Sequence, residues 1–269
     1  MRELEKEIGG PLLERDRRGK FTPLAQALLP LFQELLATHD RVYSQSRQLA
    51  QGEQGSLSVA VAPFLAEQWL PDVIARFIQR HPRIKIRTIE ERSSNIRSLV
   101  ADGTVNIGVA GLLAGDPKLS IKPVAIDYYG VLCSADHPFA RRRSTTWNAL
   151  RGEKLIGSDA LEVLVRAGLA ARITPPDLIV TSRAPLLACV RKNLGITILP
   201  MLTRPAQSAG LAFVPLTRPK LTRTLAIVTR STESLLPAGV RLEAMLLESL
   251  RDFALAKGAT PAEAKSAPR

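Results

Sequence analysis

The sequence contains few of the residues that most often carry catalytic or metal chemistry. Among its 269 residues are two cysteines and three histidines, and aromatic residues make up 4%. Cys133 and Cys189 are too few for a disulfide framework, so we expect two reduced core thiols. His39, His81 and His137 lack the spacing of metal ligands, and the sequence has no nucleophile elbow or phosphate-binding loop. We therefore expect no catalytic residues, no metal site and no cofactor.

Long apolar runs are also missing. No run approaches the roughly 18 residues that span a bilayer. The N-terminal residues MRELEKEIGG are charged, whereas a secretory signal would be apolar at this point. The 45% of hydrophobic residues is enough for one large core or two modest ones. These features predict a cytoplasmic protein with no membrane partner.

The net charge of +12 invites a nucleic-acid partner, but its distribution is uneven. Residues 1–52 hold 8 basic and 7 acidic residues and contribute +1. Residues 53–269 hold 29 basic and 18 acidic residues and contribute +11. The excess therefore lies outside the N-terminal segment, where it fits either an anionic small ligand or a basic solvated surface.

The N-terminal segment begins with a helix end and a basic hairpin. Residues 1–8 are predicted to end a helix, because Gly9-Gly10 supplies a stop and Pro11 bars continuation. The hairpin that follows turns at Asp16-Arg17-Arg18-Gly19, where glycine tolerates positive φ.

A long helix is predicted next, from the capping pair Thr22-Pro23 to about Gln51. Roughly 28 residues at 1.5 Å each span about 42 Å. Apolar residues recur along it at steps of three, four and seven, and they are Leu24, Leu28, Leu31, Leu35, Val42 and Leu49. The length and this stripe favour a dimerisation seam, with a core helix as the alternative.

After a linker at residues 51–56, short apolar runs alternate with amphipathic stretches. Strands are expected at 57–62, 84–89, 107–110, 131–133, 155–157, 178–180 and 196–199, and helices at 64–81, 94–101, 160–171 and 184–193. The alternation predicts an α/β protein with parallel-rich sheets and crossover helices, in two lobes. A late strand at 225–229 and a helix at 240–256 are expected to return to the first lobe.

The N-terminal stretch "RELEKEIGGPLLERDRRGKFTPLAQALLP" resembles the winged-helix module of LysR-type transcriptional regulators. The family pattern is matched by Arg2, Leu4, Glu5, Ile8, Gly9, Pro11, Leu12, Leu13, Arg15, Phe21, Thr22 and Ala25. Gln26 stands where the family usually has glycine. The stretches "LPDVIARFIQRHPRIKIRTIE", "LVADGTVNIGVAG" and "CVRKNLGITILP" resemble the effector domain of the same family.

The resemblance implies a two-lobed, periplasmic-binding-protein-like effector domain behind a partial winged helix-turn-helix. The expected boundaries are 1–22 for the partial DNA-binding module, 23–52 for the linker and dimerisation helix, 55–129 with 222–256 for effector lobe I, 130–221 for effector lobe II, and 257–269 for a disordered tail.

The family reads bases with the front of its recognition helix, and that part would precede Met1. The expected DNA-backbone contacts are Arg2, Arg15, Arg17, Arg18 and Lys20. Such cations position a protein on phosphates without specifying sequence. This truncation predicts weak, salt-dependent DNA binding with little sequence preference.

The resemblance also places a small-molecule effector between the lobes, where helix N-termini point free N–H groups at a ligand. The candidate effector-binding residues are Pro63, Phe64, Leu65, Ala110, Gly111, Ser158, Asp159, Thr181 and Ser182. Ser158 and Ser182 would bind a carboxylate or serve only as N-caps, and Phe64 would touch the ligand or belong to the core. Pro63 and Phe64 favour an organic acid or aromatic compound over a sulfate-like effector.

The predicted function is that of a LysR-type regulator, a homodimer or tetramer that binds DNA and an effector. One alternative is a cytoplasmic two-lobed small-molecule-binding protein without a DNA role, and another is an enzyme on the same scaffold. The leucine stripe favours the regulator, because a binding protein needs no dimer seam. The missing nucleophile and histidine constellations disfavour the enzyme.

Overall fold

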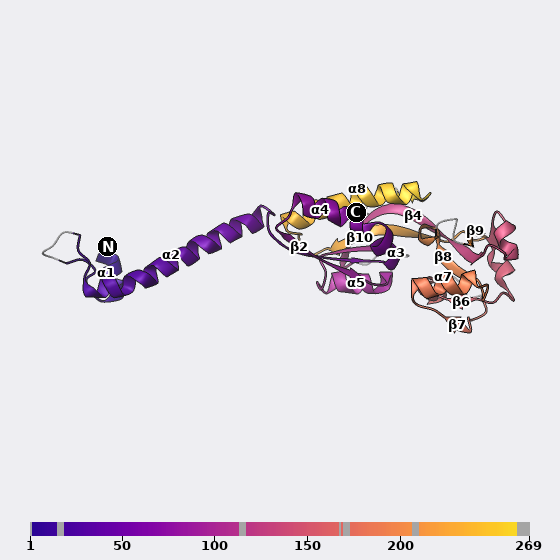
Figure 1. Cartoon of the computed structure of the whole chain (residues 1–269), viewed down its shortest axis with the longest axis horizontal. Helices are drawn as coiled ribbons and strands as arrows, with labels where there is room; N and C mark the ends of the chain where they lie inside the picture. The colour runs from indigo at the N-terminus through magenta and orange to yellow at the C-terminus, as the bar shows by residue number, and fades with distance from the viewer. Residues whose placement is uncertain are drawn as a thin grey trace. The chain divides into compact units, whose positions relative to one another are not determined.

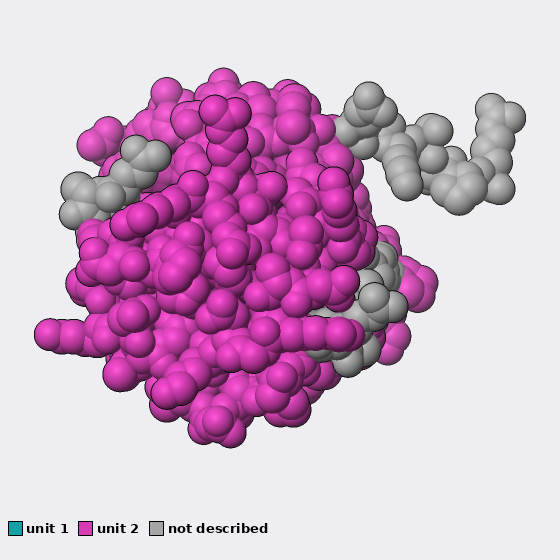
Figure 2. All heavy atoms as spheres, turned by 90° about the vertical axis from the view of Figure 1, so that its right-hand side faces the viewer, with its two compact units in different colours: residues 1–53 teal, residues 54–269 magenta. Residues whose placement is uncertain are grey.

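The computed structural model describes residues 2–14, 19–112, 117–166, 168, 173–205 and 210–262. The chain forms two compact units, residues 1–53 and residues 54–269, and each has its own internal packing. The second unit is a closely packed body, drawn in magenta in Figure 2.

The first unit begins with a short helix and a hairpin. Helix α1 (Arg2–Ile8) ends at Gly9, whose φ of +83° is the left-handed conformation that glycine adopts freely. Leu13 and Phe21 form an antiparallel bridge that closes the base of the hairpin. Residues 15–18, where the sequence predicts the turn, lie outside the described part of the chain.

Helix α2 (Pro23–Ala50) is the long helix of the first unit (Figure 1). The Thr22 hydroxyl accepts a hydrogen bond from the Ala25 N–H at 3.1 Å, which makes Thr22 the N-cap. The same hydroxyl donates to the Pro11 carbonyl at 2.8 Å and so fixes the helix start to the hairpin. Pro30 lies within the second turn, and the helix continues past it.

The second unit contains the remaining elements. Its strands are β1 (Gly55–Val61), β2 (Ile84–Glu90), β3 (Ile107–Leu112), β4 (Leu119–Ser134), β5 (Thr145–Thr146), β6 (Ile156–Gly157), β7 (Leu178–Ile179), β8 (Thr197–Pro200), β9 (Leu211–Thr217), β10 (Thr222–Arg230) and β11 (Thr260–Pro261). Its α-helices are α3 (Pro63–Gln68), α4 (Leu70–Arg80), α5 (Ser93–Ala101), α6 (Asp159–Arg166), α7 (Arg183–Arg191) and α8 (Pro237–Ala256), and its 3₁₀ turns are η1 (Pro138–Arg141), η2 (Trp147–Leu150) and η3 (Met201–Thr203).

The main sheet is mixed, in the order β2-β1-β3-β10-β4-β9-β5. Strand β1 pairs in parallel with β2 and β3. Strand β10 then enters antiparallel between β3 and β4, and β4 is antiparallel to β8, β9 and β11. The fold is therefore α/β with parallel strands at one edge and antiparallel strands in the middle.

Three hydrophobic clusters share the long strand β4. Val124 and Ala125 belong to the first core, with β1, β3, β10, α4, α5 and α8, and we call this body the first lobe. Val131 and Cys133 belong to the second core, with β8, β9 and α6, and Leu132 packs with α7 in a smaller third cluster. We call the second and third clusters together the second lobe. Helices α4 and α8 cover one face of the first-lobe sheet and α5 covers the other (Figure 1).

One predicted helix is two helices. The expected helix at 64–81 breaks at Trp69, whose φ of −133° and ψ of −47° are not helical, into α3 and α4. The cause is Pro71, because its ring clashes with the carbonyl four residues earlier in a continuous helix.

Strand β4 begins at Leu119, twelve residues before the strand expected at 131–133. Its N-terminal part holds Pro123, which has no N–H to donate. The register of β4 against β10 shifts at this point, with Pro123 opposite Ala226 and Ala125 opposite Leu225.

The expected disordered tail from residue 257 is wrong for residues 257–262. Ala259 is buried, Thr260 and Pro261 pair with β4, and the Ala262 N–H donates to the Val124 carbonyl at 3.2 Å. Sheet pairing thus holds a segment that lacks apolar periodicity. Residues 263–269 lie outside the described part of the chain.

Candidate effector cleft

The predicted effector residues lie at the ends of β1 and β3 in the first lobe and before or at the starts of α6 and α7 in the second, and we call this region the candidate cleft. After β1, Ala62 caps α3 without a side-chain hydrogen bond, and Pro63 is the first helical residue. Phe64 is only 4% exposed. The side chains of Leu65 and Ala110 are fully buried in the first core, so at those two predicted residues a ligand would meet only the backbone.

A buried ion pair lies beside Phe64. The Arg223 guanidinium carbon is 5.5 Å from the centre of the Phe64 ring, and Arg223 Nη2 is 3.0 Å from Asp127 Oδ2. The side chains of Arg223 and Asp127 are 9% and 0% exposed. A Cβ atom on Gly111 would lie 2.7 Å from Arg223 Cδ, so the glycine gives the arginine its path across β3.

Asp127 is fully satisfied by hydrogen bonds. Its Oδ1 accepts from the N–H groups of Tyr128 at 2.9 Å and Leu202 at 3.2 Å, and its Oδ2 also accepts from Arg223 Nε at 3.2 Å. Burial raises the pKa of Asp127, and the Arg223 guanidinium offsets part of that rise. The pair joins β10, β4 and η3 at the base of the cleft.

One edge of the cleft is crossed by an ion pair between α5 and α6. Arg92 precedes α5, and its Nε is 3.0 Å from Oδ2 of Asp159, the first residue of α6. Arg92 Nη1 is also 3.6 Å from Glu162 Oε2. The other oxygen of Asp159 is buried without a hydrogen-bond partner among the described residues. Burial raises the pKa of Asp159, Arg92 lowers it, and Glu162 and Glu91 raise it further.

Ser158, just before α6, is occupied by the fold. Its hydroxyl donates to the Ile198 carbonyl at 3.3 Å and accepts from the Leu161 N–H at 3.3 Å. The second bond is an N-cap. The Ser158 hydroxyl therefore already donates one hydrogen bond and accepts another within the protein.

The other edge is crossed by an ion pair between α3 and α7. Arg183 Nε is 3.4 Å from Glu67 Oε2, and Arg183 Nη1 donates to the Thr203 carbonyl at 2.8 Å. Ser182 is the N-cap residue of α7, yet its side chain makes no capping bond. Thr181 and Ser182 are both exposed, so their hydroxyl groups face solvent at this edge.

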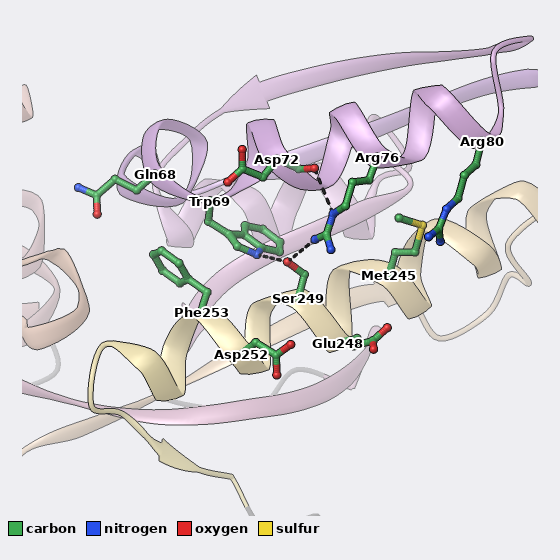
Figure 3. A pocket seen from close by; sticks show the side chains of 10 residues that line it. All are labelled: Gln68, Trp69, Asp72, Arg76, Arg80, Met245, Glu248, Ser249, Asp252 and Phe253. Carbon is green, nitrogen blue, oxygen red and sulfur yellow. Dashed lines mark hydrogen bonds between the residues drawn. The ribbon is translucent and has the colours of Figure 1, made fainter.

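A separate hollow of about 500 Å³ lies on the first lobe between α4 and α8 (Figure 3). Trp69 Nε1 and Arg76 Nη2 each donate to the Ser249 hydroxyl at 3.0 Å, and these bonds hold the two helices together. Asp72, Glu248 and Asp252 also line it, together with Arg76 and Arg80. The residues predicted from the sequence do not include this hollow.

The predicted DNA and dimer residues lie in the first unit. Arg2 and Lys20 are exposed, whereas Arg15, Arg17 and Arg18 lie outside the described residues. Most of the predicted stripe is exposed in the single chain, with Leu28 half-buried; the exposed members are Leu24, Leu31, Leu35, Val42 and Leu49. Sequence reasoning missed Leu36 and Tyr43, which are 62% and 70% exposed on the same helix.

Two kinds of site are absent from the described residues. No group of three His, Cys, Asp or Glu side chains is placed to hold a metal ion within the described ranges. In that same part of the chain, no helix has both the length and the apolar character to cross a bilayer.

Residues 50–251 match the family model described as the LysR substrate binding domain. The chain belongs to the LysR family. It is 27% identical over 259 residues to the HTH-type transcriptional regulator YbhD of Escherichia coli (strain K12), an alignment that covers 94% of this chain and 82% of that protein. It is 24% identical to the probable hydrogen peroxide-inducible genes activator of Mycobacterium avium, over 85% of this chain and 76% of that one.

Solved structures agree on the fold of this LysR-type regulator. The oxidized form of OxyR from Corynebacterium glutamicum superposes with a TM-score of 0.73 at 22% identity. The superposition covers 96% of this chain and 84% of that chain. The relatives named above are transcriptional regulators, which places this chain in a family of effector-sensing regulators and gives the alternative without a DNA role no support.

Proposed function

We propose that this LysR-type regulator senses an organic acid or aromatic compound in the cleft between its two lobes. In this proposal the lobes keep the boundaries expected from the sequence, 55–129 with 222–256 and 130–221. The observation that carries the proposal is that two ion pairs connect the lobes, Arg92 with Asp159 and Arg183 with Glu67. Each joins a helix of the first lobe to a helix of the second.

An effector can alter these ion pairs, because they lie between the two lobes. The side chains of Arg92 and Asp159 are 42% and 31% exposed, so the pair contributes little to stability and exchanges partners at low cost. A ligand bound between the lobes alters their separation and thereby the balance of these contacts. A ligand shifts such an equilibrium by as much as its affinity differs between the two arrangements.

The exposed hydroxyls at the α7 edge are the contact points that can be tested without disturbing the core. Thr181 and Ser182 are exposed and hold no side-chain capping bond, so they are free to donate to a carboxylate. Pro63, Phe64, Gly111, Ser158 and Asp159 complete the proposed lining. Phe64 belongs mainly to the first core and contributes only the 4% of its surface that is exposed.

The first unit supplies DNA contact and assembly in this proposal. Arg2 and Lys20, together with Arg15, Arg17 and Arg18 of the hairpin turn, contact phosphates. The apolar stripe on α2 pairs two copies, so the working form is a homodimer or tetramer. The protein acts in the cytoplasm and carries no catalytic role.

The experiment is a thermal-shift screen of carboxylic acids and aromatic compounds against the full chain, followed by calorimetric titration of each hit. Thr181→Ala with Ser182→Ala is expected to weaken a carboxylate hit at least tenfold, because two hydrogen bonds to a charged group are lost. Ser144→Ala, also an exposed serine of the second lobe, is the matched control. A hit that binds the double variant and the wild type equally well would place the effector elsewhere.

A further inference from the structure

Three cations from distant parts of the chain meet where α3, α7 and the end of α8 come together. Arg183 begins α7, Arg204 follows η3, and Lys257 caps the C-terminus of α8. Arg183 Nη1 donates to the carbonyl of Thr203, which is the residue before Arg204. Arg204 Nη2 in turn donates to the Lys257 carbonyl at 3.2 Å. Two hydrogen bonds from arginine side chains to backbone carbonyls therefore hold the three residues close together.

The charge of this cation cluster (Arg183, Arg204 and Lys257) is not balanced. Among the described residues, Glu67 is the carboxylate that pairs with it, through Arg183 Nε. Lys257 Nζ donates to Gln68 Oε1, a neutral group. Burial lowers the pKa of Lys257, Arg183 and Arg204 lower it further, and Glu67 only partly offsets this. Like charges held together in a partly buried position repel one another more strongly than in water.

The position of Lys257 is fixed by the chain that follows it. Ala259 is buried, and its N–H donates to the Ala254 carbonyl at 3.0 Å. Thr260 and Pro261 then pair with β4. The lysine backbone is therefore held at both ends, by α8 and by the sheet.

Donors remain available in the cation cluster. Among the described residues, Arg183 makes its contacts through Nε and Nη1, which leaves Nη2. Within the same ranges Arg204 makes its contact through Nη2, which leaves Nε and Nη1. Guanidinium groups present planar pairs of donors that match the oxygens of phosphate and carboxylate groups, and an ammonium adds a compact point charge.

We propose that the cation cluster binds a small oxyanion with a charge near −2, such as inorganic phosphate or a dicarboxylate. The anion neutralises the excess charge and takes up the remaining donors. It also links the lobes, because Lys257 caps α8 of the first lobe and Arg183 belongs to α7 of the second. The site lies beyond the effector residues predicted from the sequence, and its test reads anion binding alone, so it stands or falls separately from the proposed regulator function.

The test is calorimetric titration of the full chain with sodium phosphate at pH 7, at an ionic strength held constant with sodium chloride. Arg204→Gln with Lys257→Gln is expected to weaken phosphate binding at least tenfold. Arg151→Gln with Lys192→Gln removes the same charge from two exposed side chains outside the cluster and is expected to bind like the wild type. Constant ionic strength separates a specific site from general attraction to a basic protein.

A second variant acts in the opposite direction. Glu67→Gln removes the carboxylate that competes for Arg183, so phosphate is expected to bind several-fold more tightly. The Glu67 side chain is 64% exposed, and its replacement leaves the fold intact. A purely structural role for this residue would not raise anion affinity. The proposal is overturned if the wild type gives no saturable phosphate heat, or if all three variants bind phosphate equally.

Discussion

Arg223 of β10 and Asp127 of β4 form an ion pair, with Nη2 and Oδ2 3.0 Å apart, close to where β4 leaves the first core for the second. Both side chains are buried. The pair connects the two strands that form the centre of the sheet, and through the Leu202 N–H it also holds η3. The stability of the centre of the sheet therefore depends on the Asp127 carboxylate.

Asp127→Ala is expected to destabilise the second unit by about 3–5 kcal/mol, because it leaves the Arg223 charge buried without a partner. Urea unfolding followed by circular dichroism measures the change. Asp127→Ala with Arg223→Met is expected to recover part of the loss, since the unpaired charge is then removed. A double variant as unstable as the sum of its two single variants would contradict this coupling.

Gly130 of β4 lies where there is no room for a side chain. A Cβ atom there would lie 2.3 Å from the Phe213 ring and 2.7 Å from the Val214 carbonyl oxygen, which belongs to the backbone and cannot rotate away. Gly130→Ala is expected to cost about 2–3 kcal/mol, at the upper end of overpacking effects. Gly152→Ala is the comparison, because nothing lies within 4 Å of its added Cβ and only its φ of +82° resists the change. Equal unfolding midpoints for the two variants would contradict the steric argument.

The leucine stripe of α2 yields a prediction about assembly. Leu31 and Leu35 are 61% and 63% exposed in the single chain, so charge at these positions leaves the folding of one chain unaffected. Leu31→Lys with Leu35→Lys is expected to convert the oligomer into a monomer, because two like charges would face each other across the seam. Light scattering coupled to size-exclusion chromatography measures the mass. Gln33→Lys with Glu34→Lys, exchanges at non-apolar positions of the same helix, is the control and should remain oligomeric.

Cys133 is expected to be chemically inert, although one relative is named a hydrogen peroxide-inducible genes activator. Burial raises the pKa of the Cys133 thiol to about 11. At pH 7 the thiolate is then about one part in ten thousand, and it rises about tenfold per pH unit. Labelling with a thiol reagent at pH 7 should therefore modify Cys189, which is partly exposed, and leave Cys133 unmodified until the chain unfolds. Rapid labelling of a Cys189→Ser variant would contradict this.

The features that sequence reasoning found are those whose causes are local. Thr22 caps α2 through a bond to a residue three positions away, and the glycine at the end of α1 acts on its own backbone. The same reasoning overlooked Pro71, although its effect on the helix around Trp69 is also local. Periodicity drew attention to the apolar faces on both sides of that proline and not to the break between them.

The features that it missed depend on partners distant in the chain. Asp127 is buried because Arg223, 96 residues later, lies beside it, and no local window contains that information. The local sequence around Lys257 predicts a disordered tail. The segment is ordered because Thr260 and Pro261 pair with Ile126 and Ala125 of β4, which are far away in the chain. The candidate effector residues follow strand ends, so they include Asp159 but omit its partner Arg92 and both members of the Arg183–Glu67 pair.

The first unit offers a test of DNA contact that does not require a known operator. Arg2 and Lys20 are exposed, and they lie before and after residues 15–18 in the sequence. If each neutralises one phosphate, the logarithm of the binding constant falls with the logarithm of salt concentration by about 0.9 per contact. Arg2→Gln with Lys20→Gln should therefore make the slope shallower by about 1.8, measured by fluorescence anisotropy on a random duplex. Arg151→Gln with Lys192→Gln removes the same charge from the second unit, and an equal loss of slope in that control would mean that DNA is held by the overall charge of the protein.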